Sequence, residues 1–480
     1  MQNEIFSPVI REIPFDGPDR VYEKLYSKNS FLLESVKGPS GISRYSFICI
    51  DPYLVYKVKD GAVEIECGGK KTVPSKNPLG WLKELVTAYR QKEVEGLPPF
   101  QGGAAGIFCY DFARYLERLP STADDDIGMP DAHFFMIDRL VAFDHLKGKS
   151  WIIVCPGVRQ TALGYTEIPG GGSAHKAESE AAADDIEDKI LHGRPAVFAK
   201  KRAAQNVELI NETGRTGYMD MVKRAKEYIA AGDIFQANLS LRVSAKTGDR
   251  EPWEIYRTLR EINPSPFAAF MDFGDYQIVS SSPERLVRVR GGIVDTRPIA
   301  GTRPRGRSTR EDALLRRELL LNEKERAEHI MLIDLERNDL GRISEYGSVV
   351  VDELMVTEEY SHVMHIVSNV RGTLAAGKDC FSVVRAVFPG GTITGVPKVR
   401  CMQIIDEIEK TRRGPYTGSL GYIGFNGNMD LNIVIRTFLL RDGTAYIQAG
   451  SGIVADSDPE REYQESMKKA EALIKTLQNV

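Results

Sequence analysis

The charged residues near the C-terminus have the types and spacing to bind a cation and an anion together. In DSDPEREYQESMKKAEAL, residues 456–473, Asp458 can cap a helix, and the proline after it suits the first helical position. Glu462, Glu465 and Lys469 follow three and four residues apart, so at about 100° per residue they share one stripe of that helix. A solvent-exposed charged face is the alternative interpretation of this stripe.

A second acidic pair lies in NEKERAEHIML, where Glu325 and Glu328 are also three residues apart and an apolar run follows. This pattern predicts another helix with both carboxylates on one side. If the two helices face each other, four carboxylates would surround one ion. Carboxylate oxygens are the ligands that hard cations prefer, so the sequence predicts a Mg²⁺ site.

Two further residues are candidates for proton transfer. Glu284 follows a proline in SSSPERLV at the edge of a predicted strand, and burial there would raise its pKa and make it a general acid. A surface glutamate is the alternative. His365 alternates with apolar residues in SHVMHIVS, which predicts a strand, and a hydrogen-bonded core histidine is the alternative to a catalytic one.

Several segments could recognise an anionic substrate. The Gly/Thr loop FPGGTITGVPKVR, residues 388–400, leads into a helix and offers free N–H groups, although an ordinary turn would look the same. Tyr416 could donate to a carboxylate or simply pack in the core. Arg436 is a lone cation in the predicted apolar strand NIVIRTFLL, and facing inward it would need an anion. The glycines of AGSGIV, residues 449–454, allow backbone to approach a ligand.

The elements that must position these residues are mainly strands. Runs of β-branched and aromatic residues joined by turns such as Asn426-Gly427 predict antiparallel hairpins in both halves, with a few helices between them. We therefore predict an α+β fold with large antiparallel sheets. The break PGGGS suggests a strand-rich N-terminal domain at 1–165, a linker with a surface helix at 166–214, and a catalytic domain at 215–480.

Composition excludes several classes of function. The net charge of −4 gives no reason to expect a nucleic-acid partner, and the six cysteines never have CxxC spacing. No apolar run approaches membrane-spanning length, and the N-terminus lacks the core of a signal peptide. We therefore expect a cytoplasmic protein with no membrane partner.

Four longer segments are similar to those of the chorismate-utilising enzymes: PIAGTRPRG, EKERAEHIMLIDLERNDLGRIS, FPGGTITGVPKVR and GSGIVADSDPEREYQES. In the N-terminal half, LLES, SRYSF and FQGGAAG resemble the two amine-forming branches of that family, anthranilate synthase and aminodeoxychorismate synthase. The resemblance covers nearly the whole chain. It implies a sandwich of sheets with helices packed outside, and Mg²⁺-dependent chemistry on chorismate.

The resemblance gives a role to each candidate residue. Glu328 and Glu465 match Mg²⁺ ligands, with Glu325 and Glu462 supporting them directly or through water. Glu284 matches the acid that protonates the departing C4 hydroxyl. The positions that match substrate-binding residues or line the pocket are Gln236, Ala300, Thr302, Thr392, Tyr416, Arg436, Gly450, Gly452 and Lys469.

Within that set the resemblance distinguishes two anion sites. Tyr416 and Arg436 would hold the enolpyruvyl carboxylate of chorismate. Lys469 and the glycine amides of the 450–452 segment would hold the ring carboxylate together with the metal. His365 matches the histidine near the reacting ring carbons.

Only a few residues indicate which reaction of the family this chain would catalyse. Members that add water use a lysine where this chain has Gln236, so ammonia is the expected nucleophile. Asn238 and the Phe267-Ala268 pair resemble aminodeoxychorismate synthase, which we favour. Ala300 points to anthranilate synthase, the alternative, because many aminodeoxychorismate synthases have a nucleophilic lysine there and a methyl group cannot attack.

Either branch implies a glutamine amidotransferase partner that supplies ammonia, since no cysteine here lies in a nucleophile-elbow context. Glu34 and Ser35 match the place where anthranilate synthase binds tryptophan. Phe267-Ala268 replaces the Tyr-Met pair of the regulated pocket, which argues against tryptophan inhibition but leaves a structural tryptophan open.

Overall fold

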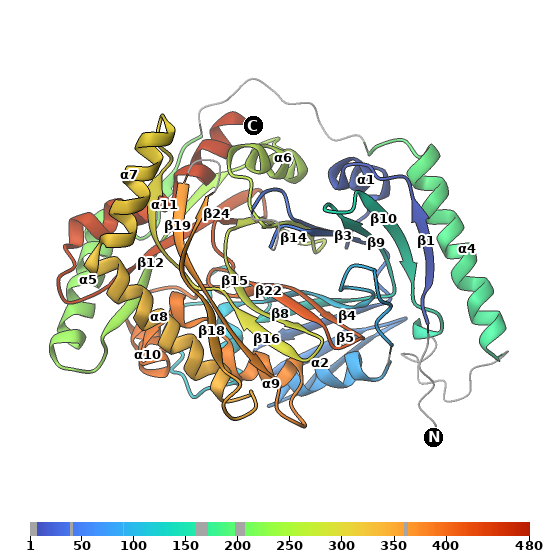
Figure 1. Ribbon diagram of the computed structural model, residues 1–480, viewed down its shortest axis with the longest axis horizontal. Coiled ribbons are helices and arrows are strands. Elements are labelled where there is room, and N and C mark those ends of the chain that lie inside the picture. The colour runs from blue at the N-terminus through green and yellow to red at the C-terminus, as the bar shows by residue number, and fades with distance from the viewer. Residues whose placement is uncertain (1–6, 39–41, 90, 160–170, 197–206, 360–362) are drawn as a thin grey trace.

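Two large antiparallel sheets form the centre of the molecule, and helices cover their outer faces (Figure 1). This computed structural model describes residues 7–38, 42–89, 91–159, 171–196, 207–359 and 363–480. Every pairing between its named strands is antiparallel. The predicted α+β class is confirmed.

Sheet I has twelve strands among the described residues. In spatial order they are β1 (Val9–Ile13), β10 (Lys149–Val154), β9 (Arg139–Asp144), β3 (Tyr45–Cys49), β2 (Phe31–Glu34), β13 (Phe267–Asp272), β14 (Tyr276–Ser282), β23 (Thr437–Arg441), β24 (Thr444–Ile453), β12 (Gln236–Lys246) and β11 (Ile210–Asn211), with β20 (Gly395–Val396) also paired to β12.

Sheet II likewise has twelve strands in the described part of the chain. In spatial order they are β17 (Ile299–Pro304), β19 (Val363–Thr373), β16 (Ile293–Thr296), β15 (Arg285–Arg290), β22 (Met429–Asn432), β21 (Ser419–Gly424), β7 (Gly103–Phe108), β8 (Ala132–Ile137), β4 (Leu54–Lys59), β5 (Ala62–Glu66) and β6 (Lys70–Pro74), with β18 (Val350–Glu359) also paired to β19.

The helices lie mostly outside the sandwich (Figure 1). They are α1 (Pro18–Leu25), α2 (Pro78–Thr87), α4 (Gly171–His192), α5 (Arg215–Ala230), α6 (Pro252–Ile262), α7 (Thr309–Leu321), α8 (Glu323–Gly341), α9 (Cys380–Val387), α10 (Lys398–Ile408) and α11 (Pro459–Asn479), with the 3₁₀ turns η1 (Tyr110–Tyr115) and η2 (Gly391–Ile393). Helix α11 packs on β24, α8 on β19, and α10 on β12.

Aromatic side chains fill the space between the sheets. Phe31 from β2 stacks on Phe135 from β8 with ring centroids 4.8 Å apart, and Phe47 from β3 meets Tyr422 from β21 at 5.4 Å. Because each strand contributes alternate residues to this core, the register of both sheets is fixed by which face is apolar.

The regions before and after the predicted linker are joined within both sheets. In sheet I, β2 pairs with β13, and in sheet II, β7 pairs with β21. Each sheet therefore contains one block of N-terminal strands and one block of C-terminal strands. The division at 1–165, 166–214 and 215–480 stays a prediction from sequence.

The apolar run NIVIRTFLL is not one strand, as the sequence suggested. Strand β22 ends at Asn432 in sheet II, and β23 begins at Thr437 in sheet I, so the chain crosses between sheets over residues 433–436. Arg436 has a left-handed φ of 54° at this crossing. The prediction failed because both strands are buried, which leaves a continuous apolar run with no turn residue between them.

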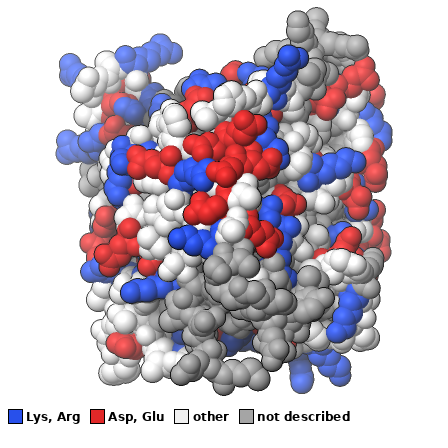
Figure 2. All heavy atoms as spheres, turned by 90° about the vertical axis from the view of Figure 1, so that its right-hand side faces the viewer, with Lys and Arg blue, Asp and Glu red and all other residues white. Residues whose placement is uncertain are grey.

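Helix α4 packs against β1 and β10 at one end of the sandwich. Acidic side chains gather on the face that carries this helix (Figure 2). Three of them, Glu180, Asp184 and Glu187, bind the Arg11 guanidinium of β1, which fixes the helix on the edge of sheet I. No helix in the described chain has the length and apolarity needed to cross a membrane.

Candidate active site

Glu284 lies in the connection between β14 and β15, and only 8% of the residue is exposed. Its carbonyl accepts the Ile433 N–H at 3.0 Å, which fixes the backbone. Thr392 Oγ1 donates to Oε1 of the carboxyl group at 3.2 Å. Burial raises the pKa of Glu284 to about 7. The surface alternative therefore does not hold, and the carboxyl group can give or take a proton near neutral pH.

His365 lies on β19 opposite Thr302 of β17. Its Nδ1 is 3.1 Å from the Gly301 carbonyl oxygen and 3.0 Å from Thr302 Oγ1. A carbonyl can only accept, so Nδ1 carries the proton, and Nε2 is the acceptor nitrogen. Burial lowers the pKa of His365, which favours the neutral ring. Ala300 lies on β17, the strand of Thr302, one residue before the bulge at Gly301.

The acidic pair on α8 is half-buried. Asn322 caps the helix by accepting the Glu325 N–H at 3.0 Å. Glu325 Oε1 accepts from Arg303 Nη1 at 2.7 Å, whereas its buried Oε2 has no partner among the described residues. Burial raises the pKa of Glu328, and the charges of Glu325 and Glu465 raise it further. The acidic groups of α8 and α11 are thus near enough to repel one another.

On α11 the predicted stripe is present, but its members already have partners. Glu465 pairs with Lys469 at 2.8 Å, and Lys469 Nζ also donates to the Gly450 carbonyl at 3.0 Å. Glu462 Oε1 accepts from Ser457 Oγ at 2.6 Å. Lys469 thereby connects α11 to β24. The Glu465 carboxylate remains accessible, because 57% of its side chain is exposed.

These carboxylates fit a hard cation by chemistry. Among the described residues, no three Asp, Glu, His or Cys side chains are close enough together to hold a metal ion without moving. Glu325 Oε2 is nevertheless a buried acceptor without a donor in the described part of the chain, and the pKa of Glu328 is raised by burial, with the negative charges of Glu325 and Glu465 adding to the shift. A divalent cation would relieve both conditions, and its ligands would be the carboxylate oxygens that Mg²⁺ prefers.

Arg436 lies beside the backbone of Lys469 on α11, and Tyr416 lies beside Gly450 of β24. Arg436 Nη1 donates to the backbone carbonyl of Lys469, and no acidic side chain of the described residues pairs with the guanidinium. Burial lowers the pKa of Arg436, as expected for a cation without an anion. A Cβ on Gly450 would lie 3.0 Å from the Tyr416 hydroxyl, so the absent side chain leaves room beside it.

Two amide side chains of β12 are unsatisfied. Gln236 Oε1 and Asn238 Oδ1 are both buried without a hydrogen-bond partner in the described structure. A Cβ on Gly452 would collide with the Gln236 amide nitrogen, so the glycine permits this packing. Buried acceptors without donors are rare in native proteins and mark places where a ligand or water donates.

Sequence reasoning missed Arg413, which connects the segments around the site. Its guanidinium pairs with Glu409 at 2.7 Å and donates to the carbonyls of Ile393 at 3.2 Å and Asn238 at 2.5 Å. Glu409 Oε1 in turn accepts the Ser240 N–H at 2.8 Å. The four-residue spacing of Glu409 and Arg413 was the only sequence signal, and it is indistinguishable from a surface ion pair.

The predicted tryptophan-type pocket corresponds to a cavity of about 70 Å³ whose lining includes Glu34, Ser35, Phe267 and Tyr422. The Glu34 carboxylate is already bound by Arg260 at 2.8 Å and by a tyrosine hydroxyl, and Ser35 Oγ donates to a backbone carbonyl. The structure brings the two residues to one pocket, but their polar groups hold the protein together.

Proton transfer to a small anionic molecule is the chemistry that this arrangement supports. The family model for chorismate binding enzymes matches residues 28–475, and the chain belongs to that family. It is therefore a chorismate-utilising enzyme.

Individual relatives divide between two activities. Aminodeoxychorismate synthase component 1 of Bacillus subtilis is 44% identical over 98% of this chain and 97% of its own length. Anthranilate synthase component 1 of Acetivibrio thermocellus is also 44% identical, over 93% of this chain and 90% of its own. The crystal structure of anthranilate synthase component I from Streptococcus pneumoniae superposes with a TM-score of 0.78 at 36% identity, covering 90% of this chain and 92% of that one.

Proposed function

We propose that this enzyme replaces the C4 hydroxyl of chorismate with an amino group and gives 4-amino-4-deoxychorismate. The balanced reaction consumes chorismate and ammonia and releases water. The buried Glu284 carries this proposal. With a pKa of about 7 it can protonate the departing hydroxyl at neutral pH, and Thr392 holds the carboxyl group in place.

Two unsatisfied acceptors favour ammonia as the nucleophile. Gln236 Oε1 and Asn238 Oδ1 are buried without partners in the described structure, and ammonia brings three N–H donors that could satisfy them. Neither amide is basic enough to deprotonate water, so ammonia, which needs no base to attack, suits this position better than water does.

Recognition of the substrate rests on the buried cation. Arg436 has no acidic partner in the described residues, and a carboxylate of chorismate would supply the missing charge. Tyr416 stands beside Gly450 and could donate to the same group. Lys469, the last member of the charged stripe on α11, would contact the other carboxylate.

Glu328 and Glu465 would hold Mg²⁺, with Glu325 and Glu462 next to them. When bound, the ion would draw negative charge from the ring carboxylate of the substrate. The chain's own contribution is to hold the carboxylates of α8 and α11 near enough for their charges to interact. The bond from Lys324 to Asp456 at 3.0 Å supports this, because it ties the start of α8 to the segment before α11.

The ammonia must come from another subunit. All six cysteines have their pKa raised by burial, so none provides the reactive thiolate that a glutaminase requires. We infer that a glutamine amidotransferase subunit delivers ammonia to this chain. The designation component 1 of both curated relatives agrees with a second component.

Anthranilate synthesis is the second candidate, and Ala300 favours it. The methyl side chain of this alanine cannot act as a nucleophile. For C4 amination, ammonia would therefore have to make the attack that the lysine makes in the lysine-bearing enzymes of the family. An anthranilate-forming enzyme would instead add ammonia at C2 and release pyruvate.

Product analysis separates the two candidates. The chain is incubated with chorismate, Mg²⁺ and an ammonium salt at alkaline pH, and the products are resolved by chromatography with mass detection. We expect a product that retains the enolpyruvyl group and no release of pyruvate. Anthranilate with an equal amount of pyruvate would overturn the assignment to C4. Glutamine in place of ammonium serves as the control and should give no product without the partner subunit.

A further inference from the structure

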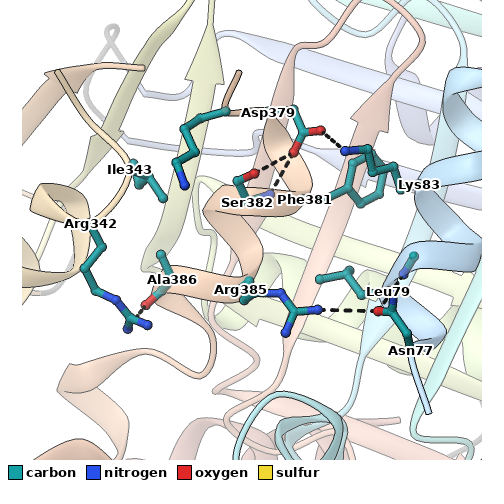
Figure 3. Close-up of a pocket in the computed structure, with 12 residues that line it drawn as sticks. Asn77, Leu79, Lys83, Arg342, Ile343, Asp379, Phe381, Ser382, Arg385 and Ala386 are labelled. Atoms are coloured by element: carbon teal, nitrogen blue, oxygen red, sulfur yellow. Dashed lines mark hydrogen bonds and ion pairs between the residues drawn. The ribbon is translucent and has the colours of Figure 1, made fainter. Parts of the chain in front are cut away.

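A second cavity, of about 340 Å³, lies between α2, α9 and the end of α8, and none of the predicted active-site residues lines it (Figure 3). Its floor is apolar, because it is formed by four buried hydrophobic residues, Leu79, Ile343, Phe381 and Ala386. Its volume falls in the range of about 300–1,000 Å³ that is usual for small-molecule sites.

The rim of this cavity is strongly positive. Four cationic side chains line it, namely Lys83, Arg342, Lys378 and Arg385, against one carboxylate, Asp379. The formal charge is therefore +3. These cations come from three segments of the chain that are far apart in sequence, so their convergence is a property of the fold.

The one carboxylate is fully engaged. Asp379 caps α9 by accepting the Ser382 N–H at 2.8 Å and the Ser382 hydroxyl at 3.0 Å. It also pairs with Lys83 at 2.7 Å. In Figure 3 this group lies above the Arg342 and Arg385 guanidinium groups and beside Lys83. Asp379 therefore neutralises Lys83, and no other carboxylate lines the cavity beside Arg342, Lys378 and Arg385, although the charge of Asp339 behind the lining acts on Arg342.

Those three cations have weak contacts or none. Arg342 Nη1 lies 3.4 Å from the Ala386 carbonyl, and Arg385 Nη2 lies 3.4 Å from the Asn77 amide oxygen. Both acceptors are neutral and both distances are long for a hydrogen bond. The Lys378 ammonium group has no hydrogen-bond or ion-pair partner in the part of the chain that the structure describes. Like charges around a shared space repel unless an anion separates them.

We propose that this cavity binds a small polyanion, a molecule with two or more oxyanion groups on a short apolar body. Two guanidinium groups provide forked donors for oxyanions, and Lys378 adds a third charge. The apolar floor would accommodate the body of the ligand. Phosphate esters and polycarboxylates share this chemistry, and the site is independent of the reaction proposed above.

The test is calorimetric titration of the full chain with pyrophosphate and, separately, with citrate, at constant ionic strength. We expect saturable binding at one site by at least one of them, and the tighter probe identifies phosphate or carboxylate chemistry. The variant that combines Lys378→Gln with Arg385→Gln should weaken binding tenfold or more. Lys76→Gln removes an exposed charge that does not line the cavity, and should have little effect.

Two results would overturn the proposal. One is the absence of binding by both probes at millimolar concentration. The other is binding that the double variant retains but that Arg436→Gln abolishes, because the probe would then occupy the active site. The thermal midpoint of the double variant without ligand shows whether it folds. Since its substitutions relieve repulsion between exposed cations, the midpoint should equal or exceed that of the parent.

Discussion

Glu284→Gln should stabilise the protein above neutral pH while it removes activity. The folded state raises the pKa of this carboxyl group from 4.5 to about 7 because burial disfavours the charged form. The folded state therefore holds a proton that the unfolded state releases. Stability is unaffected by this group below about pH 4.5, falls as pH rises from 4.5 to 7, and is reduced by a constant amount above 7.

The magnitude follows from the size of the shift. A rise of the pKa from 4.5 to about 7 corresponds to about 3 kcal/mol of lost stability at pH 8.5. A glutamine has the same shape, can accept the Thr392 hydrogen bond, and carries no charge to bury. With an unfolding entropy that scales with chain length, the variant should melt about 3 °C higher than the parent at pH 8.5. At pH 4.5 the two should melt together.

Calorimetry from pH 4.5 to 9 in the presence of a chelator measures this difference without interference from metals. Glu261→Gln is the matched control, because that glutamate is exposed at the end of α6 and its replacement should leave the pH dependence unchanged. The reasoning fails if the difference in melting temperature does not grow with pH, or if the variant is less stable at pH 8.5. Chorismate turnover by the variant should fall by about a hundredfold or more, since a positioned acid typically contributes that much.

Four other substitutions test separate parts of the site. Gln236→Leu should raise the KM for ammonium while it leaves the KM for chorismate nearly unchanged. In the same steady-state assays, Arg436→Gln should raise the KM for chorismate and leave the KM for ammonium nearly unchanged. Equal effects of one variant on both KM values would contradict the assignments. Glu465→Ala should raise the Mg²⁺ concentration for half-maximal activity at least tenfold, whereas an unchanged Mg²⁺ titration would exclude it as a ligand. Arg413→Met leaves the buried Glu409 charge unpaired, so urea denaturation should show a loss of about 3–5 kcal/mol.

The helices that carry the acidic pairs could be predicted because their ends are encoded locally. Asp458 accepts the Arg461 N–H at 3.0 Å to begin α11, as its place before a proline indicated. Asn322 does the same for α8. Once a helix is established, its geometry fixes which residues share a side, so Glu325 and Glu328 needed no tertiary information.

The role of Arg413 and the backbone position of Arg436 could not be predicted, because both depend on segments that are distant in sequence. Arg413 binds carbonyls of residues 238 and 393, which are brought together by the pairing of β12 with β20, directly after the η2 turn. Arg436 owes its position to the crossing between sheets, which an uninterrupted apolar run conceals. The second cavity is hidden for the same reason, since α2 and α9 are about 300 residues apart in sequence.

The unsatisfied groups of the site form a pattern that limits what can bind there. One is a donor without an anion, Arg436, and three are buried acceptors without donors in the described residues, namely Gln236 Oε1, Asn238 Oδ1 and Glu325 Oε2. A carboxylate alone satisfies only the first, and a cation alone only the last. A dicarboxylate, a divalent cation and a small N–H donor together satisfy all four. This combination is the one that the proposed amination of chorismate would bring together.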